Sequence, residues 1–136
     1  MSYSIFETEL TVRPDDIDMN NHVHVSKYAD YVLAARYDQM QRCYKMPMDD
    51  FIRMGYGWVV ITSHIEYKRP LLLGDVVLIR TSIAEVRKTG VKVVFEIVKK
   101  ESKKLVSEGY FEYSMVNLST GRATEIPKEV IERYSI

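Results

Sequence analysis

The side chains best suited to acid–base chemistry are concentrated between residues 15 and 24. The sequence there reads Asp-Asp-Ile-Asp-Met-Asn-Asn-His-Val-His, with three carboxylates and two imidazoles within ten residues. Carboxylates and imidazoles often act as general bases or nucleophiles near neutral pH. Asp and Asn are also common in turns and helix caps. The segment is therefore either a reactive loop or a capping loop that precedes a helix.

A metal site is the less favoured interpretation of the two imidazoles. His22 and His24 are two residues apart, and such residues point to one side only in an extended chain. No third ligand follows at a diagnostic spacing. The chain also lacks a phosphate-binding loop, a dinucleotide fingerprint and a nucleophile elbow. We expect no metal and no cofactor.

The remaining reactive side chains favour structural roles. Cys43 falls on the apolar stripe of an expected helix, where a thiol acts as a small apolar group. His64 alternates within an expected strand. A single cysteine permits no internal disulfide, and the first residues lack the basic segment of a signal peptide. These features predict a cytoplasmic protein.

Charge and composition exclude several classes of function. The 136 residues include 19 Lys plus Arg and 19 Asp plus Glu, so the formal net charge is zero. A balanced charge argues against binding to nucleic acid or to an anionic membrane surface. Hydrophobic residues make up 46% and charged residues 28% of the chain, which is typical of a globular protein. We expect one domain over residues 1–136 and no transmembrane helix.

One long helix should directly follow the polar segment. Tyr28, Tyr31, Val32 and Ala35 occupy positions i, i+3, i+4 and i+7, which form one face of a helix. The pattern predicts a helix over about residues 27–43, with Ser26 as its N-cap.

Alternating apolar residues predict strands in the rest of the chain. The expected strands cover residues 6–13, 58–67, 76–86, 91–98 and 105–118, and Pro127 should open a short helix. Lys88, Thr89 and Gly90 suit a hairpin in which the glycine adopts a positive φ. Four consecutive strands after one helix favour an antiparallel α+β sheet.

Two blocks of sequence resemble the hotdog-fold thioesterases. Residues 12–23, Val-Arg-Pro-Asp-Asp-Ile-Asp-Met-Asn-Asn-His-Val, are followed by Tyr28 and by Ala35-Arg36. This block is similar to the 4-hydroxybenzoyl-CoA thioesterase branch and to acyl-ACP thioesterases. Residues 66–75, Glu-Tyr-Lys-Arg-Pro-Leu-Leu-Leu-Gly-Asp, resemble the family's Tyr-x-x-Pro-x-x-x-Gly-Asp link. The resemblance implies a hotdog fold, with a five-stranded antiparallel sheet wrapped around one central helix and a short C-terminal helix.

The resemblance also implies roles for the polar segment. The family's catalytic carboxylate falls on Asp18, which would act as general base or nucleophile in thioester hydrolysis. Asn20 and His22 match two further positions implicated in acyl-ACP thioesterases. Relatives usually continue His-Val-Asn-Asn, whereas this chain has His24 and Val25 in place of the two asparagines.

The second half of the implied site lies elsewhere in the chain. The family polarises the thioester carbonyl with a backbone N–H near a glycine, which corresponds to Gly57, followed by Trp58 and Val59. The two halves come from different subunits of a dimer in this family. We therefore expect a homodimer, and further pairing into a tetramer.

The implied substrate is an acyl-CoA or acyl-ACP thioester. Its acyl chain would pass Tyr28, Tyr31 and Val32 beside the helix. The carrier phosphates would meet the basic side chains that follow two of the strands, namely Arg69, Arg87 and Lys88.

Two alternatives share the fold. A hotdog dehydratase would place a histidine on the long helix in one branch, but this helix offers only Asp30 and Asp38. A non-catalytic acyl-binding protein would keep the pocket without turnover, and the change to His24 and Val25 keeps this alternative open.

Overall fold

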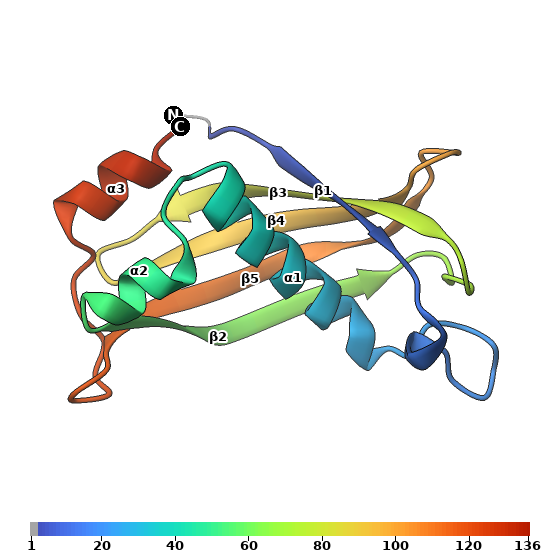
Figure 1. The fold of residues 1–136 in the computed structure, drawn as a ribbon, viewed down its shortest axis with the longest axis horizontal. Coiled ribbons are helices and arrows are strands. Elements are labelled where there is room, and N and C mark those ends of the chain that lie inside the picture. The colour runs from blue at the N-terminus through green and yellow to red at the C-terminus, as the bar shows by residue number, and fades with distance from the viewer. Residues whose placement is uncertain (1–2) are drawn as a thin grey trace.

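The computed structural model describes residues 3–136, which form one antiparallel sheet with a long helix lying across it (Figure 1). The sheet order is β1-β3-β4-β5-β2, so β1 and β2 are its two edges. All neighbouring strands pair antiparallel. The strands are β1 (Phe6–Thr11), β2 (Tyr56–Tyr67), β3 (Val76–Val86), β4 (Gly90–Lys99) and β5 (Leu105–Asn117). The expected α+β hotdog arrangement is confirmed.

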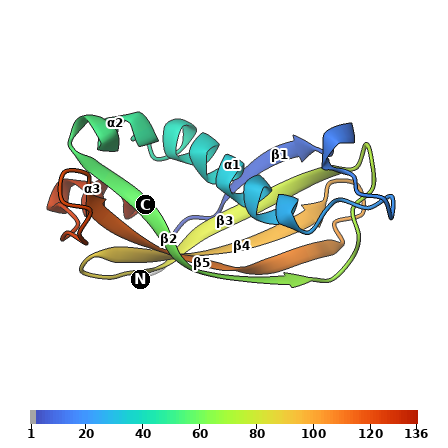
Figure 2. The ribbon, with the colours of Figure 1, turned by 90° about the horizontal axis from the view of Figure 1, so that it is seen from below.

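The long helix α1 covers Ser26–Arg42, one residue away from its expected bounds. Figure 2 shows it lying over one face of the curved sheet. The predicted N-cap is wrong, because Val25 occupies that position and makes no side-chain cap bond. The backbone N–H of Ser26 instead donates to Nδ1 of His24 at 3.1 Å. The imidazole of His24 therefore supports the first turn of α1.

Three short helical segments complete the chain. The C-terminal helix α3 (Lys128–Tyr134) follows Pro127 as expected. The 3-10 turn η1 (Pro14–Asp16) and the helix α2 (Met48–Arg53) were not predicted. Both are too short to repeat an apolar stripe, so periodicity cannot reveal them. Among the described residues, no helix has the length and apolar character needed to cross a bilayer.

The reason for a glycine at position 90 differs from the prediction. Gly90 does not have a positive φ. A Cβ at this position would collide with the backbone carbonyl oxygen of Tyr113 on β5. Glycine is therefore required by the close approach of β4 to β5 and not by the turn.

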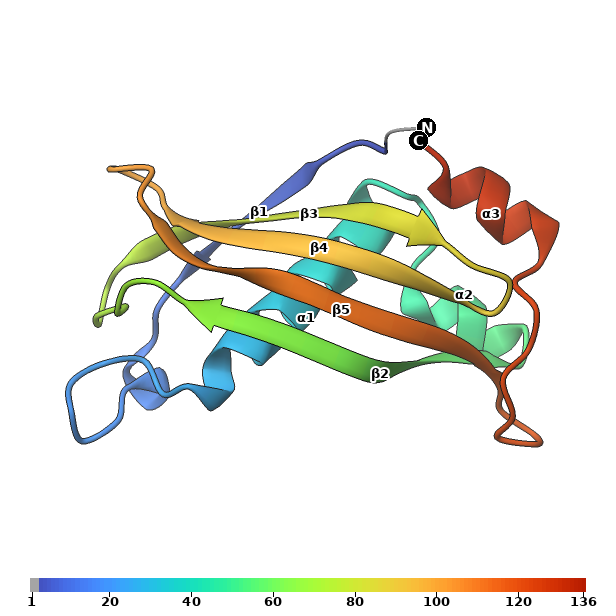
Figure 3. The ribbon, with the colours of Figure 1, turned by 180° about the vertical axis from the view of Figure 1, so that it is seen from behind.

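The interior divides into two clusters along α1. One cluster lies beside the N-terminal half of the helix and includes Tyr28, Tyr31 and Val32. The other lies beside its C-terminal half and includes Met40 and residues of α2 and α3. The opposite face of the sheet carries no helix (Figure 3). Ion pairs occur there, such as Arg80 with Glu7 at 2.6 Å.

Candidate active site

A tight turn presents the Asp18 side chain just before α1. Ile17 and Val23 form an antiparallel bridge at the base of the turn. The Asp18 N–H donates to the His22 carbonyl at 2.9 Å, and the Asn21 N–H donates to the Asp18 carbonyl at 3.0 Å. Asn21 has a φ of 63°, a left-handed conformation that Asn tolerates better than most residues. The local sequence thus closes a compact loop over residues 17–23, called the Asp18 loop below.

Backbone groups fix one oxygen of the Asp18 carboxylate. Oδ1 accepts hydrogen bonds from the N–H groups of Asn20 at 2.9 Å and His22 at 3.4 Å. Oδ2 has no hydrogen-bond partner within residues 3–136, and the side chain is only half-buried. The side chains of Asn20 and His22 are exposed and make no hydrogen bond to Asp18. The structure therefore brings their backbone to the carboxylate and leaves their side chains facing outward.

A buried pair fastens this loop to α1. The Tyr31 hydroxyl donates to Oδ2 of Asp16 at 2.6 Å, and both residues are buried. Burial alone would raise the pKa of Asp16, but hydrogen bonds from Tyr31 and from the Arg13 backbone lower it overall. Burial and the adjacent carboxylate raise the pKa of Tyr31, so its hydroxyl remains a donor. Asp16 is thus a charged anchor for the Asp18 loop.

The Asp18 loop lies where β2 ends, far from Gly57 in the same chain. The Val23 N–H donates to the Leu71 carbonyl at 2.8 Å, and Tyr28 packs edge-on against Tyr67 with ring centroids 5.0 Å apart. Gly57 lies at the start of β2, ten residues before Tyr67. At about 3.3 Å per residue this separation is roughly 33 Å. The two halves of the implied site therefore do not meet within one protomer.

The backbone N–H of Trp58 points to the free edge of the sheet. Trp58 pairs with Met115 on β5. The N–H of Met115 donates to Thr89, and its carbonyl accepts from Thr124, so both groups point away from β2. In an antiparallel ladder, two residues directly opposite each other either exchange both hydrogen bonds or exchange none. Trp58 and Met115 exchange none, and the Trp58 N–H therefore faces outward.

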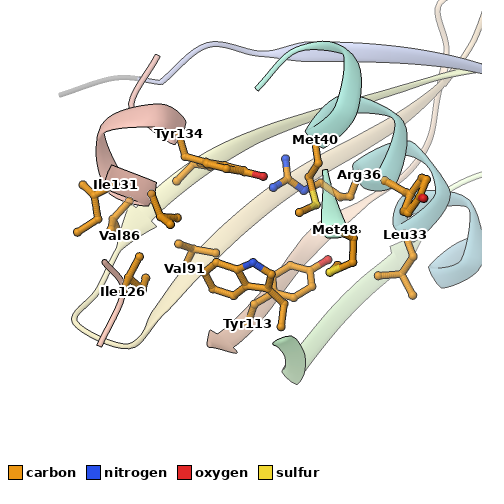
Figure 4. A pocket seen from close by; sticks show the side chains of 14 residues that line it. Leu33, Arg36, Met40, Met48, Val86, Val91, Tyr113, Ile126, Ile131 and Tyr134 are labelled. Carbon is orange, nitrogen blue, oxygen red and sulfur yellow. The ribbon is translucent and has the colours of Figure 1, made fainter. Parts of the chain in front are cut away.

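An apolar cavity of about 250 Å³ lies beside Trp58 (Figure 4). Its walls come from the C-terminal half of α1, from α3 and from the sheet, and include Leu33, Met40, Ile83, Val91 and Val130. These residues are distant in the sequence, so no local pattern indicates the cavity. Of the site residues expected from the sequence, Trp58 lines it.

Arg36 also lines this cavity and was not predicted as a site residue. It is only 7% exposed and lies four residues after Val32 on the buried face of α1. Charged residues are rarely buried, so a charge on the apolar stripe of the expected helix could have indicated a site residue from the sequence alone. The Tyr113 hydroxyl lines the same cavity from β5.

The other expected binding residues occupy varied positions. Tyr28 and Tyr31 are packed in the interior and do not line the cavity. Val59 is 42% exposed on the edge strand β2. Within residues 3–136, no group of three His, Cys, Asp or Glu side chains is arranged to hold a metal ion.

Two of the three expected basic residues already have partners. The Arg69 guanidinium donates to the Leu105 carbonyl at 2.7 Å. Arg87 pairs with Glu112 and with Glu85. Lys88 is exposed and makes no ion pair with any residue that the structure describes. Its carbonyl accepts from the Ile126 N–H, beside the cavity wall.

Comparisons with known proteins identify the family of the chain. Residues 12–134 match the model of the thioesterase-like superfamily. The chain is 24% identical over 132 residues to the long-chain acyl-CoA thioesterase FadM of Escherichia coli K12, covering 93% of this chain and 95% of FadM.

Solved structures with the same fold include two hypothetical proteins. One is from Aquifex aeolicus, with a TM-score of 0.88, 26% identity and coverage of 95% of this chain and 98% of that one. The other is from Staphylococcus aureus and was solved in complex with CoA. Its TM-score is 0.84 at 21% identity, covering 98% of this chain and 83% of that one.

Proposed function

This chain belongs to the thioesterase-like superfamily, and on that premise we propose that it hydrolyses acyl-CoA thioesters with Asp18 as the catalytic carboxylate. The observation that carries the proposal is the Asp18 carboxylate itself. Two backbone N–H groups hold Oδ1, and Oδ2 is open to a water molecule or a substrate. The likeness to FadM, a long-chain acyl-CoA thioesterase, supports CoA as the carrier. The Staphylococcus aureus protein solved with CoA supports it as well.

The chemistry requires an activated oxygen nucleophile and a donor for the developing oxyanion. Asp18 acts either as a general base, taking a proton from water, or as a nucleophile that forms an anhydride. The outward N–H of Trp58 donates to the thioester oxygen as the carbonyl carbon becomes tetrahedral. Collapse of that intermediate expels a thiolate. Because thiols have a pKa of about 8.5, this leaving group demands no strong general acid.

Both groups can act on one substrate only if two protomers combine. The edge strand β2 exposes Val59, Val60 and Ile61, and an uncovered apolar edge favours pairing with another strand. Antiparallel pairing of β2 with β2 of a second copy, limited to residues that follow Trp58 so that the Trp58 N–H stays outside the new ladder, would bring the Trp58 end of one protomer to the Asp18 loop of the other. We propose this homodimer as the functional unit, with tetramer formation a further step. Light scattering should show at least a dimer, and a monodisperse monomer would contradict the proposal.

The same dimer would gather basic groups around the composite site. Lys88 lies close to the Trp58 end of its own protomer, because the neighbouring Thr89 carbonyl accepts from Met115, the partner of Trp58. Arg69 follows β2 on the side of the Asp18 loop, so Arg69 of the second copy would approach Lys88. These two cations are our candidates for contacts with the carrier phosphates. Arg87 contributes less, because two carboxylates already neutralise it.

A substrate panel tests the proposed activity. Acyl-CoA thioesters from short to long chains, with benzoyl-CoA and phenylacetyl-CoA, are incubated with the protein, and released thiol is measured with a thiol-reactive dye. We expect thiol release from at least one member of the panel. The same acyl groups on ACP identify the carrier. Binding without thiol release from either carrier would contradict hydrolysis and favour an acyl-binding protein.

A further inference from the structure

Arg36 places a positive charge in the apolar cavity without a counter-ion. Its side chain is more than nine-tenths buried, and its Nη1 atom has no hydrogen-bond partner among residues 3–136. No carboxylate lies within ion-pair distance of it in the described part of the chain. An unpaired buried charge carries a large desolvation cost, so proteins rarely keep one without a function.

The groups around Arg36 compensate for its charge only in part. The guanidinium carbon lies 5.3 Å from the centre of the Tyr44 ring, a cation–π contact. Figure 4 shows the guanidinium between Met40 and Tyr134, whose hydroxyl points toward it. That hydroxyl donates to the Met46 carbonyl. None of these groups supplies a negative charge.

The Tyr113 hydroxyl is a second polar group in the cavity without a partner. Its oxygen is buried and makes no hydrogen bond to any residue that the structure describes. Burial raises the pKa of Tyr113, although the nearby positive charge of Arg36 lowers it in part, so the phenol remains a hydrogen-bond donor at neutral pH. The cavity thus combines a cationic donor, Nη1 of Arg36, with a neutral donor, the Tyr113 hydroxyl. Neither donates to a partner among the described residues.

The remaining walls restrict what can occupy the cavity. They are formed mainly by aliphatic and methionine side chains. A cavity of about 150 Å³ is sufficient for benzene. This cavity of about 250 Å³ would by proportion hold a group of about ten non-hydrogen atoms. Its occupant needs an apolar body and a single anionic end.

On the basis of the proposed function, we propose that this cavity binds an acyl group whose far end is a carboxylate. The substrates are then CoA monothioesters of short dicarboxylic acids. Their thioester lies at the outward N–H of Trp58, their apolar middle passes the Trp58 side chain, and their terminal carboxylate accepts hydrogen bonds from Arg36 and Tyr113. A planar carboxylate suits a guanidinium, which can donate two parallel N–H groups. A phosphate would carry more charge into a pocket that offers few donors.

Matched substrates test the proposal on one enzyme. Adipoyl-CoA and hexanoyl-CoA have six-carbon acyl groups and differ at the far end, which is a carboxylate in one and a methyl group in the other. We expect kcat/KM to favour adipoyl-CoA by about 10- to 100-fold, since hydrogen bonds to charged groups are of that strength. A preference for hexanoyl-CoA, or equal rates, would overturn the proposal.

Two variants test whether the preference for adipoyl-CoA arises in the cavity. Arg36→Met keeps an unbranched side chain and removes the charge, so the ratio of the two kcat/KM values should fall to about one or below. Tyr113→Phe removes one oxygen and should lower the ratio by a smaller factor. The ratio does not depend on the fraction of folded enzyme, because both substrates are measured on the same sample. An unchanged ratio of the two kcat/KM values in Arg36→Met would show that Arg36 does not bind the far end of the acyl group.

A binding measurement separates this inference from the proposed hydrolysis. The thioethers S-(5-carboxypentyl)-CoA and S-hexyl-CoA cannot be hydrolysed. Trp58 is the single tryptophan of the chain and lines the cavity, so its fluorescence reports occupancy. Tighter binding of the carboxylated thioether, abolished by Arg36→Met, would support the inference even if no thioester were cleaved. Equal binding of both would refute it even in an active thioesterase.

Discussion

The two ends of helix α1 differ in how a buried tyrosine hydroxyl beside each end is paired. At the N-terminal end, the Tyr31 hydroxyl donates to the buried Asp16 carboxylate and thereby holds the Asp18 loop. At the C-terminal end, the Arg36 guanidinium and the Tyr113 hydroxyl have no such partner. The first end is packed with aromatic and aliphatic residues, whereas the second encloses a cavity.

This difference separates two tasks along one helix. At the N-terminal end, the Tyr31 hydroxyl has its hydrogen-bond partner within the chain. This pairing suits a rigid support for the proposed catalytic carboxylate of Asp18. The C-terminal end keeps donors and space available, which suits recognition of a ligand. Because the two ends of one protomer lie far apart, the tasks combine only if a second copy brings its Asp18 loop to the cavity. Substitutions made at one end at a time should separate the two tasks.

The largest effect should come from Asp18→Asn. The substitution keeps an oxygen acceptor for the N–H groups of Asn20 and His22 but removes the carboxylate proposed as general base or nucleophile. We expect kcat for thioester hydrolysis to fall about 100- to 10,000-fold, the usual contribution of a general base. Asp15→Asn is the matched control, because the Asp15 side chain is 73% exposed and lies outside the turn. Equal losses in both variants would contradict a specific role for Asp18.

A smaller effect is expected at the other end from Trp58→Pro. Proline removes the outward N–H, and an edge strand tolerates proline where the N–H is not part of the ladder. Loss of one oxyanion donor should lower kcat about 100- to 1000-fold. Trp58→Phe keeps the N–H and an aromatic ring, so it serves as the control. If Trp58→Phe were as slow as Trp58→Pro, the side chain and not the N–H would be responsible.

The smallest effect is expected when the same change, from tyrosine to phenylalanine, is made at each of the two ends. Tyr31→Phe removes the donor to a buried carboxylate and should lower the free energy of unfolding by about 1.5–3 kcal/mol. Tyr113→Phe removes a hydroxyl that has no partner, so the free energy of unfolding should change little. Urea denaturation of both variants measures the difference. Equal losses of stability would mean that the Tyr113 hydroxyl has a partner within the folded chain.

Local patterns in the sequence were sufficient for most of the fold. The stripe from Tyr28 to Ala35 placed α1 within one residue, because an apolar face repeats over several turns. Alternation located the strands, although β2 begins two residues earlier than expected, at Tyr56. The six residues of α2 make fewer than two turns and give no such repeat. The N-cap was misassigned because the ring of His24 replaced the Ser26 hydroxyl as the capping group.

The candidate site was predictable only in part. The segment around Asp18 is continuous in sequence, so its chemistry and its likeness to a family were visible there. The cavity is built from residues between Leu33 and Tyr134, and their proximity exists only in the folded chain. Arg36 was seen as part of a motif, but its burial among tyrosines depends on β5 and α3. The cavity and its unpaired donors therefore become visible only in the folded chain.

The central claim is that each active site combines Asp18 of one protomer with the Trp58 end of the other. The most direct test is a purified heterodimer of Asp18→Asn and Trp58→Pro chains carrying different affinity tags. Each homodimer should be nearly inactive. In the heterodimer one of the two sites retains both intact halves, so kcat per dimer should reach about half the wild-type value. A heterodimer as inactive as both homodimers would place the two groups in one protomer and contradict the account.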